Sequence, residues 1–168
     1  NRQHHQRGAG GVVCYSAGFG ELGGDGEALE QKLIEVSGDL ALVGPNVFGL
    51  VNYIQGAHLW PYSHGGQRVT RGPAIISQSG MLSGYLLTNR RSVNFSYVIG
   101  AGNQSVLGVE DYLEALLTRS EVTAFGIYLE SLRDIPQFAK AALNALDRNI
   151  PLVAVSYTHL RAHETSLH

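Results

Sequence analysis

Short apolar runs alternate with amphipathic helical segments along most of this chain, and this alternation limits the folds that it can adopt. A strand that is followed by a helix and then by another strand requires parallel pairing and a right-handed crossover. The sequence therefore predicts an α/β fold with a parallel sheet, in which ligands bind at the carboxyl ends of the strands. The expected strands are 11–16, 40–43, 74–76, 97–99, 122–129 and one that begins at 151, and the expected helices begin near 25, 81, 109 and 135.

Two of the expected helices carry an apolar stripe at the spacing typical of one buried face. The first stripe consists of Val109, Tyr112, Leu113, Leu116 and Leu117. In the last helix, for which Asp134 is the expected N-cap, the stripe consists of Ile135, Phe138, Ala139, Ala142, Leu143 and Leu146. We expect both stripes to pack against the sheet.

The composition narrows the functional classes. The chain has 168 residues, of which 44% are hydrophobic, and this is enough for one domain or for parts of two. The net charge of -2 gives no basic surface for nucleic acid or anionic lipid, and no apolar run reaches the roughly 20 residues needed to span a membrane. The single Cys14 excludes an internal disulfide and fits a reducing compartment, so we expect a cytoplasmic protein that binds neither nucleic acid nor membrane.

One strand ends abruptly in small hydroxyl residues and glycine. The apolar residues 74–76 are followed by Ser77, Gln78, Ser79 and Gly80, and a helix is expected to begin there. Free N–H groups and the positive end of a helix dipole favour a bound anion, and glycine lets a phosphate approach the backbone. The sequence therefore predicts a phosphate site at Ser77, Ser79 and Gly80, with an ordinary N-cap serine as the alternative.

A glycine-rich loop follows the first expected strand. Gly18, Gly20 and Gly23 satisfy the G-x-G-x-x-G pattern, and Asp39 lies at a suitable distance for a ribose carboxylate. The next helix, however, is expected to begin only near Asp25, too late for Gly20 to lie at its N-terminus. We therefore reject a dinucleotide site in this loop.

Five motifs in order resemble the NDP-forming acyl-CoA synthetases, which are the acetate CoA ligase family and are related to the succinyl-CoA synthetase alpha subunit. The resemblance covers residues 11–154 and implies the end of a Rossmann-like CoA-binding domain (1–50), a linker (51–71) and a flavodoxin-like parallel-sheet ligase domain (72–154), both domains being incomplete. The motifs are Ala17-Gly18-Phe19-Gly20-Glu21, Gly44-Pro45-Asn46 with Gly49, Ser77-Gln78-Ser79-Gly80, Gly102-Asn103 and Tyr128-Leu129-Glu130.

The resemblance also implies a reaction and the residues that serve it. The family makes acyl-CoA from a carboxylic acid, CoA and a nucleoside triphosphate, through an acyl phosphate and a phosphohistidine. Ser79 and Gly80 match the helix N-terminus that holds the phosphoryl group, and Glu130 matches the glutamate that orients the phosphorylated histidine. The turn Gly44, Pro45 and Asn46 matches the one beside the thiol end of CoA. Val47 and Phe48 depart from the common pattern after this turn, which leaves the acyl specificity open.

The resemblance further implies partners outside this chain. These are CoA as a substrate, ATP or another NTP with Mg²⁺ on an ATP-grasp domain or beta subunit, and an oligomeric assembly; no metal site is expected within the chain. The family's phosphorylated histidine follows the strand that begins at Pro151, but residues 155–168 resemble a translated sequencing adapter. We therefore expect a non-native tail over 155–168 and an inactive fragment of an active ligase.

Three other interpretations stay open. Ser79 could be the nucleophile of a serine acyl hydrolase, but the elbow G-x-S-x-G requires glycines where Ser77 and Met81 stand. The chain could instead be a non-catalytic CoA- or phosphate-binding module, or the CoA domain of a protein acetyltransferase. His58 and His64 are interpreted as loop residues.

Overall fold

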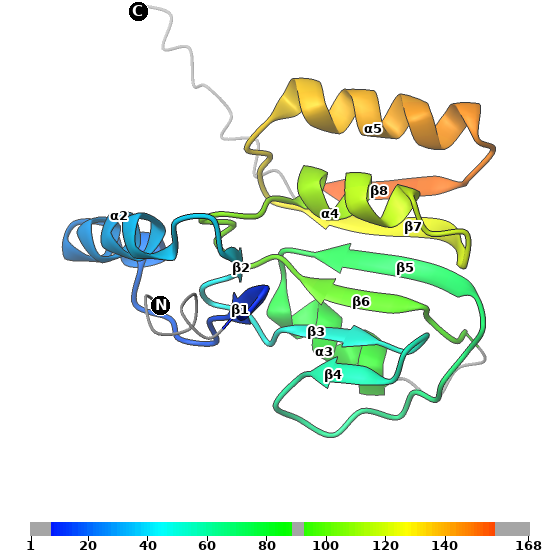
Figure 1. Ribbon diagram of the computed structural model, residues 1–168, viewed down its shortest axis with the longest axis horizontal. Coiled ribbons are helices and arrows are strands. Elements are labelled where there is room, and N and C mark those ends of the chain that lie inside the picture. Colours follow the sequence, from blue (N-terminus) through cyan, green and yellow to red (C-terminus); the bar gives the residue numbers. More distant parts are fainter. Residues whose placement is uncertain (1–7, 89–92, 157–168) are drawn as a thin grey trace, which may run out of the picture.

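The computed structural model describes residues 8–88 and 93–156, which form two β-sheets (Figure 1). The smaller sheet pairs β1 (Gly11–Val13) in parallel with β2 (Ala41–Val43). The larger sheet has the strand order β4-β3-β6-β5-β7-β8, and its last four strands run parallel. The predicted α/β class is confirmed. The bounds are β3 (Leu50–Asn52), β4 (Ala57–Leu59), β5 (Gly72–Ser77), β6 (Tyr97–Gly100), β7 (Val122–Leu129) and β8 (Leu152–Ser156).

The glycine-rich loop contains a short 3-10 helix, η1 (Gly20–Leu22), before α2 (Asp25–Ser37) begins. Gly20 therefore lies outside the N-terminus of α2, as the rejection of a dinucleotide site requires. Figure 1 shows α2 beside the small sheet and away from the larger one. The other helices of the described residues are α3 (Gly80–Thr88), α4 (Val109–Leu117) and α5 (Ile135–Asp147).

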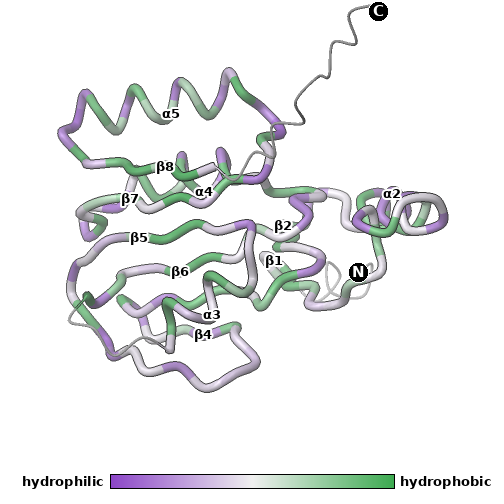
Figure 2. The backbone as a smooth tube through the Cα atoms, turned by 180° about the vertical axis from the view of Figure 1, so that it is seen from behind, coloured by the Kyte–Doolittle hydropathy of each residue, from purple (hydrophilic) through white to green (hydrophobic). Residues whose placement is uncertain are grey.

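The two faces of the larger sheet bury different helices. In β5, Ala74 and Ile76 belong to the main core together with residues of α4 and α5. Ile75 points to the other face, where Val98 of β6 packs with Leu87 of α3. Alternate residues of a strand face opposite sides, so one central strand supports both layers. The central strands are accordingly among the most hydrophobic parts of the chain (Figure 2).

The stripe predicted for α4 is confirmed, because all five of its residues are buried. The stripe predicted for α5 is wrong. Ala141 and Ala145 are buried there, whereas Leu143 and Leu146 are exposed. The helix is rotated so that these two alanines pack in the core cluster with α4 and Phe138 packs partly buried against it, while Ile135 and both leucines face solvent.

The segment 51–71, expected as a linker, contains β strands instead. β3 pairs antiparallel with β6, so that Val51 lies opposite Val98, and β4 pairs antiparallel with β3. Val51 and Tyr53 are buried in the cluster that includes Leu87. Burial of this apolar surface attaches the segment to the larger sheet, so it is a sheet edge and not a free connection.

β8 continues two residues past the expected boundary at 154. Val155 pairs with Tyr128 and Ser156 with Leu129, while Val153 and Val155 expose their side chains. The rest of the expected tail, residues 157–168, lies outside the described residues, and its origin stays a prediction. No helix in the described part of the chain is both long and apolar enough to cross a membrane.

Candidate functional site

The loops after β2 and β6 are in direct contact. The backbone N–H of Asn103 donates to the carbonyl oxygen of Pro45 at 3.1 Å, and that of Ser105 donates to the carbonyl oxygen of Gly44 at 3.3 Å. The side-chain amide of Asn46 donates to that of Asn103 at 3.3 Å. The turn predicted to lie beside CoA is therefore fixed against the carboxyl end of the larger sheet.

Gly102 makes this contact possible. Its φ is +56°, and a Cβ atom there would lie 2.3 Å from the carbonyl oxygen of Pro45 and 2.8 Å from that of Asn46. Such distances are far below van der Waals contact, and the backbone conformation itself favours glycine. Only glycine permits the two loops to approach this closely.

Two carboxylates tie the glycine-rich segment to the same loop. The side-chain amide of Asn103 donates to Glu21 Oε2 at 2.5 Å. Glu30 accepts from the hydroxyl of Ser105 and, at 2.6 Å, from the N–H of Gly20. Desolvation raises the pKa of Glu21, but the hydrogen bonds from Asn103 and Gly18 outweigh it and lower the pKa to about 2. Sequence reasoning did not identify this connection.

This depressed pKa predicts a pH dependence. A carboxylate whose folded pKa lies below its ordinary value of 4.5 contributes stability above that pH and loses the contribution as the pH falls through about 2. The side-chain amide resonances of Asn103, followed by NMR, should therefore titrate with a midpoint near pH 2 and should lose this titration in Glu21→Gln. A midpoint near 4.5 would show that the Glu21–Asn103 hydrogen bond is absent in solution.

The structure places the predicted phosphate site at the start of α3. The helix begins at Gly80, as predicted, and Ser79 Oγ accepts from the N–H of Leu82 at 3.3 Å, which makes Ser79 its N-cap. Ser77 is 0% exposed, and its hydroxyl donates to the carbonyl oxygen of Ser79 at 2.9 Å and accepts from its N–H at 3.1 Å. Ser77 therefore shapes the turn and does not face a ligand. Among the described residues, no acceptor meets the N–H groups of Gly80 and Met81.

Gln78 links this turn to the loop after β7. The side chain is 9% exposed, and its Oε1 accepts from the N–H groups of Glu130 and Ser131, the latter at 2.9 Å. Its Nε2 donates to the carbonyl oxygen of Ser131 at 2.8 Å. Because β5 and β7 pair through Ser77 and Tyr128, the exposed Glu130 follows the strand adjacent to the phosphate turn. Gln78 is a positioning residue that sequence reasoning missed, and a polar residue between two serines gave no signal of its burial.

His58 and His64 lie away from the start of α3. His64 Nε2 is 3.1 Å from Nδ1 of His58, and its Nδ1 is 3.0 Å from the hydroxyl of Tyr53. Both ring nitrogens of His64, which lies in a loop as predicted, are thus used, whereas His58 was predicted as a loop residue and lies in β4. Within residues 8–88 and 93–156, no three His, Cys, Asp or Glu side chains are grouped as a metal site requires.

A parallel sheet whose carboxyl-end loops present a helix N-terminus and a carboxylate is characteristic of a flavodoxin-like ligand-binding domain. Residues 71–166, more than half of the chain, match the family model of the succinyl-CoA ligase like flavodoxin domain. The chain belongs to this family.

Curated relatives extend the similarity over most of the chain. Trans-feruloyl-CoA synthase FCS1 of an unknown prokaryotic organism is 36% identical over 159 residues, covering 90% of this chain and 22% of that protein. The alpha subunit of ADP-forming acetate–CoA ligase II of Pyrococcus furiosus is 29% identical over 161 residues, covering 89% of this chain and 33% of that protein. The chain thus spans about a third or less of the length of these relatives.

Solved structures of similar fold include an acetyl-coenzyme A synthetase. The crystal structure of PH0766 from Pyrococcus horikoshii OT3 has a TM-score of 0.84 at 28% identity and covers 93% of this chain and 36% of that one. The apo form of the dinucleotide forming acetyl-coenzyme A synthetase 1 of Ca. Korarchaeum cryptofilum has a TM-score of 0.74 at 25% identity. This match covers 91% of the present chain and 34% of the synthetase chain. The predicted resemblance to NDP-forming acyl-CoA synthetases is therefore confirmed, while the roles of the individual site residues stay predictions.

Proposed function

We propose that this chain is the part of an NDP-forming acyl-CoA synthetase that holds the phosphoryl group during the reaction. The observation that carries the proposal is the start of α3, where the N–H groups of Gly80 and Met81 are free beside the loop that carries Glu130. Free helix N–H groups and the helix dipole stabilise phosphate. Similarity to ADP-forming CoA ligases over about nine tenths of the chain supports this choice among the phosphate-binding functions.

The proposed reaction has three balanced steps. A histidine elsewhere in the intact ligase takes the γ-phosphoryl group from the nucleoside triphosphate, and the nucleoside diphosphate is released. The carboxylate of the acid then takes the phosphoryl group and forms an acyl phosphate. Finally, the CoA thiol attacks the acyl carbon, loses its proton and expels inorganic phosphate. Gly80 and Met81 stabilise the phosphoryl oxygens, and Glu130 accepts a hydrogen bond from the histidine ring and fixes its orientation.

The other participants follow from this proposal. CoA binds with its thiol end beside Gly44, Pro45 and Asn46, which the loop after β6 fixes in place. The nucleotide, with Mg²⁺, binds to an ATP-grasp domain or to a separate subunit, as the designation "subunit alpha" of a relative suggests. The names of the relatives include both acetate and feruloyl-CoA, so they leave the acyl group open.

Transfer of radiolabelled phosphate from ATP tests the proposal in the intact ligase that contains this chain. We expect Glu130→Gln to slow phosphoenzyme formation by about 10- to 100-fold, the range for groups that orient a functional histidine. Glu35→Gln, on the exposed side of α2, is the matched control and should have no effect. Labelling that is indifferent to both Glu130→Gln and Ser79→Ala would overturn the site, and phosphate binding without any acyl-CoA formation would indicate a binding module.

A further inference from the structure

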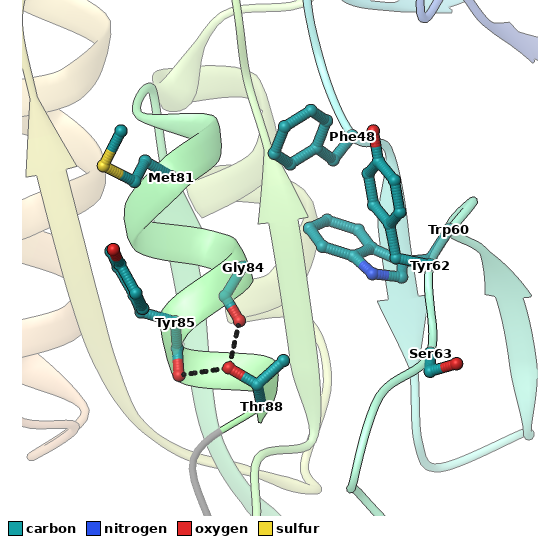
Figure 3. Close-up of a pocket in the computed structure, with 8 residues that line it drawn as sticks. All are labelled: Phe48, Trp60, Tyr62, Ser63, Met81, Gly84, Tyr85 and Thr88. Carbon is teal, nitrogen blue, oxygen red and sulfur yellow. Dashed lines mark hydrogen bonds between the residues drawn. The ribbon is translucent and has the colours of Figure 1, made fainter.

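An aromatic groove adjoins the proposed phosphate site. It has a volume of about 300 Å³ and lies between α3 and a wall formed by Phe48, before β3, and by the segment that follows β4 (Figure 3). The ring of Phe48 meets Trp60 edge to face at 5.6 Å and 88°, and Tyr62 at 5.1 Å and 83°. The other wall is α3, and the full lining is Phe48, Trp60, Tyr62, Ser63, Met81, Gly84, Tyr85 and Thr88.

The groove and the phosphate site share one end. A Cβ atom on Gly80 would lie 3.4 Å from the ring of Phe48, so this ring lies directly beside the first residue of α3. Met81 is the next residue of the helix and Tyr85 lies one turn further on; they are 69% and 67% exposed. The hydroxyl of Thr88 donates to the carbonyl oxygens of Gly84 and Tyr85, which leaves the groove wall apolar.

We infer that this groove binds the organic part of an aromatic carboxylic acid, with its carboxylate toward the N-terminus of α3; the inference rests on the proposed function. Three aromatic side chains at edge-to-face angles offer ring faces and edges on which a further planar ring gains about 0.5–1.5 kcal/mol beyond its buried area. The volume is at the small end of the range for small-molecule sites. An acetyl group would leave most of this apolar surface uncovered.

Charge decides the orientation of the acid. Among the described residues, the lining groups are apolar or weakly polar, so a carboxylate in the middle of the groove would have no charged partner there. The free N–H groups of Gly80 and Met81 lie at the end beside Phe48 and complement its charge. The carboxylate would therefore lie where the proposed reaction requires it, next to the phosphoryl group. An apolar segment of a protein partner would bring no negative charge to these N–H groups.

The chain contains one tryptophan, Trp60, and it lines the groove, so its fluorescence reports binding directly. We would titrate the 168-residue chain with 3-phenylpropanoate, and in parallel with 3-phenylpropan-1-ol and propanoate. The expected result is a saturable change with 3-phenylpropanoate and binding at least about tenfold weaker for the alcohol and for propanoate, a difference of about 1.4 kcal/mol. The alcohol lacks the charge, and propanoate lacks the ring.

Substitutions of groove residues test whether 3-phenylpropanoate binds in the groove. Tyr85→Ala and Phe48→Ala should each weaken binding of 3-phenylpropanoate by about fivefold to tenfold, since each removes one aromatic contact. The matched control is Leu143→Ala, which removes a side chain of similar exposure, 62%, from α5 on the opposite face of the sheet, and should change nothing. If Phe48→Ala does not fold, Tyr85→Ala and Met81→Ala, at exposed positions, provide the test instead.

Two outcomes overturn the inference. The first is the absence of a saturable change, and the second is equal binding of the acid and the alcohol, which would indicate an apolar protein segment as the occupant. Neither affects the phosphate-transfer assay, which depends on Glu130 and not on the aromatic rings. If 3-phenylpropanoate does not bind but the phosphoenzyme still forms, only this inference is refuted. If the acid binds but no phosphoenzyme forms, the ligase proposal is refuted.

Discussion

Replacing Gly102 by alanine is expected to lower the free energy of unfolding by about 2–4 kcal/mol. A non-glycine residue with a φ of +56° costs about 1–3 kcal/mol, and the added methyl group overlaps the carbonyl oxygen of Pro45. The methyl group would also lie 2.8 Å from the carbonyl oxygen of Asn46, and since both oxygens are backbone atoms, rotation of the neighbouring Val47 side chain does not relieve the overlap. The loop after β6 must move away from the turn at Gly44, Pro45 and Asn46, and the contact between them is lost.

Urea unfolding of the purified chain measures this effect, with Gly84→Ala as the control. Gly84 lies in the middle of α3, and a Cβ atom there meets nothing within 4 Å. Alanine has the higher helix propensity, so Gly84→Ala should raise the stability by about 0.5–1 kcal/mol. A Gly102→Ala variant as stable as the wild type would show that the two loops do not pack in this way.

Replacing Gln78 by alanine is expected to cost about 2–3 kcal/mol. The substitution removes the partly buried hydrogen bonds that Gln78 accepts from the N–H groups of Glu130 and Ser131 and the one that it donates to the carbonyl oxygen of Ser131, and each contributes about 0.5–1.5 kcal/mol. Gln55→Ala is the control, because the hydrogen bonds of Gln55 are exposed and local, and it should change the stability by less than about 0.5 kcal/mol.

NMR separates a local effect of Gln78→Ala from a global one. The amide resonances of Glu130 and Ser131 should shift and exchange faster with solvent, while those of the α4 core stay in place. Unchanged amides at both positions would mean that Gln78 does not hold the loop that carries Glu130. Equal destabilisation by Gln55→Ala and Gln78→Ala would lead to the same conclusion.

Sequence periodicity predicted those elements whose pattern agrees with their packing. β7 matches its predicted range, α4 buries its whole predicted stripe, and Asp134 caps α5 by accepting from the N–H of Gln137 at 2.8 Å. The stripe predicted for α5 is wrong because Ala141 and Ala145 pack in the core, while Leu143 and Leu146 do not. The β3–β4 hairpin was missed because its strands have only three residues each, so β3 is too short to establish a period of two, and because all residues of β4 are exposed.

In the candidate site, too, the sequence predicted local features and not contacts between distant segments. The turn at Ser79 and Gly80 was predictable because its chemistry lies in consecutive residues. Gln78 reaches Ser131, and Asn103 reaches Glu21, across long stretches of sequence, and no local pattern indicates which strands become neighbours. Phe48 was visible as a departure from the family, but its position opposite α3 depends on the hairpin that sequence reasoning missed.

The two edges of the larger sheet differ in what they offer to another molecule. β4 is three residues long and includes a histidine, so it gives little opportunity for further pairing. β8 is the outermost described strand on the other side, has five residues, and exposes Val153 and Val155. A long apolar edge is a template for strand addition and aggregation. Self-association of the purified chain should therefore begin at β8 and increase with concentration, and the solubility of any preparation depends on how well this edge is covered.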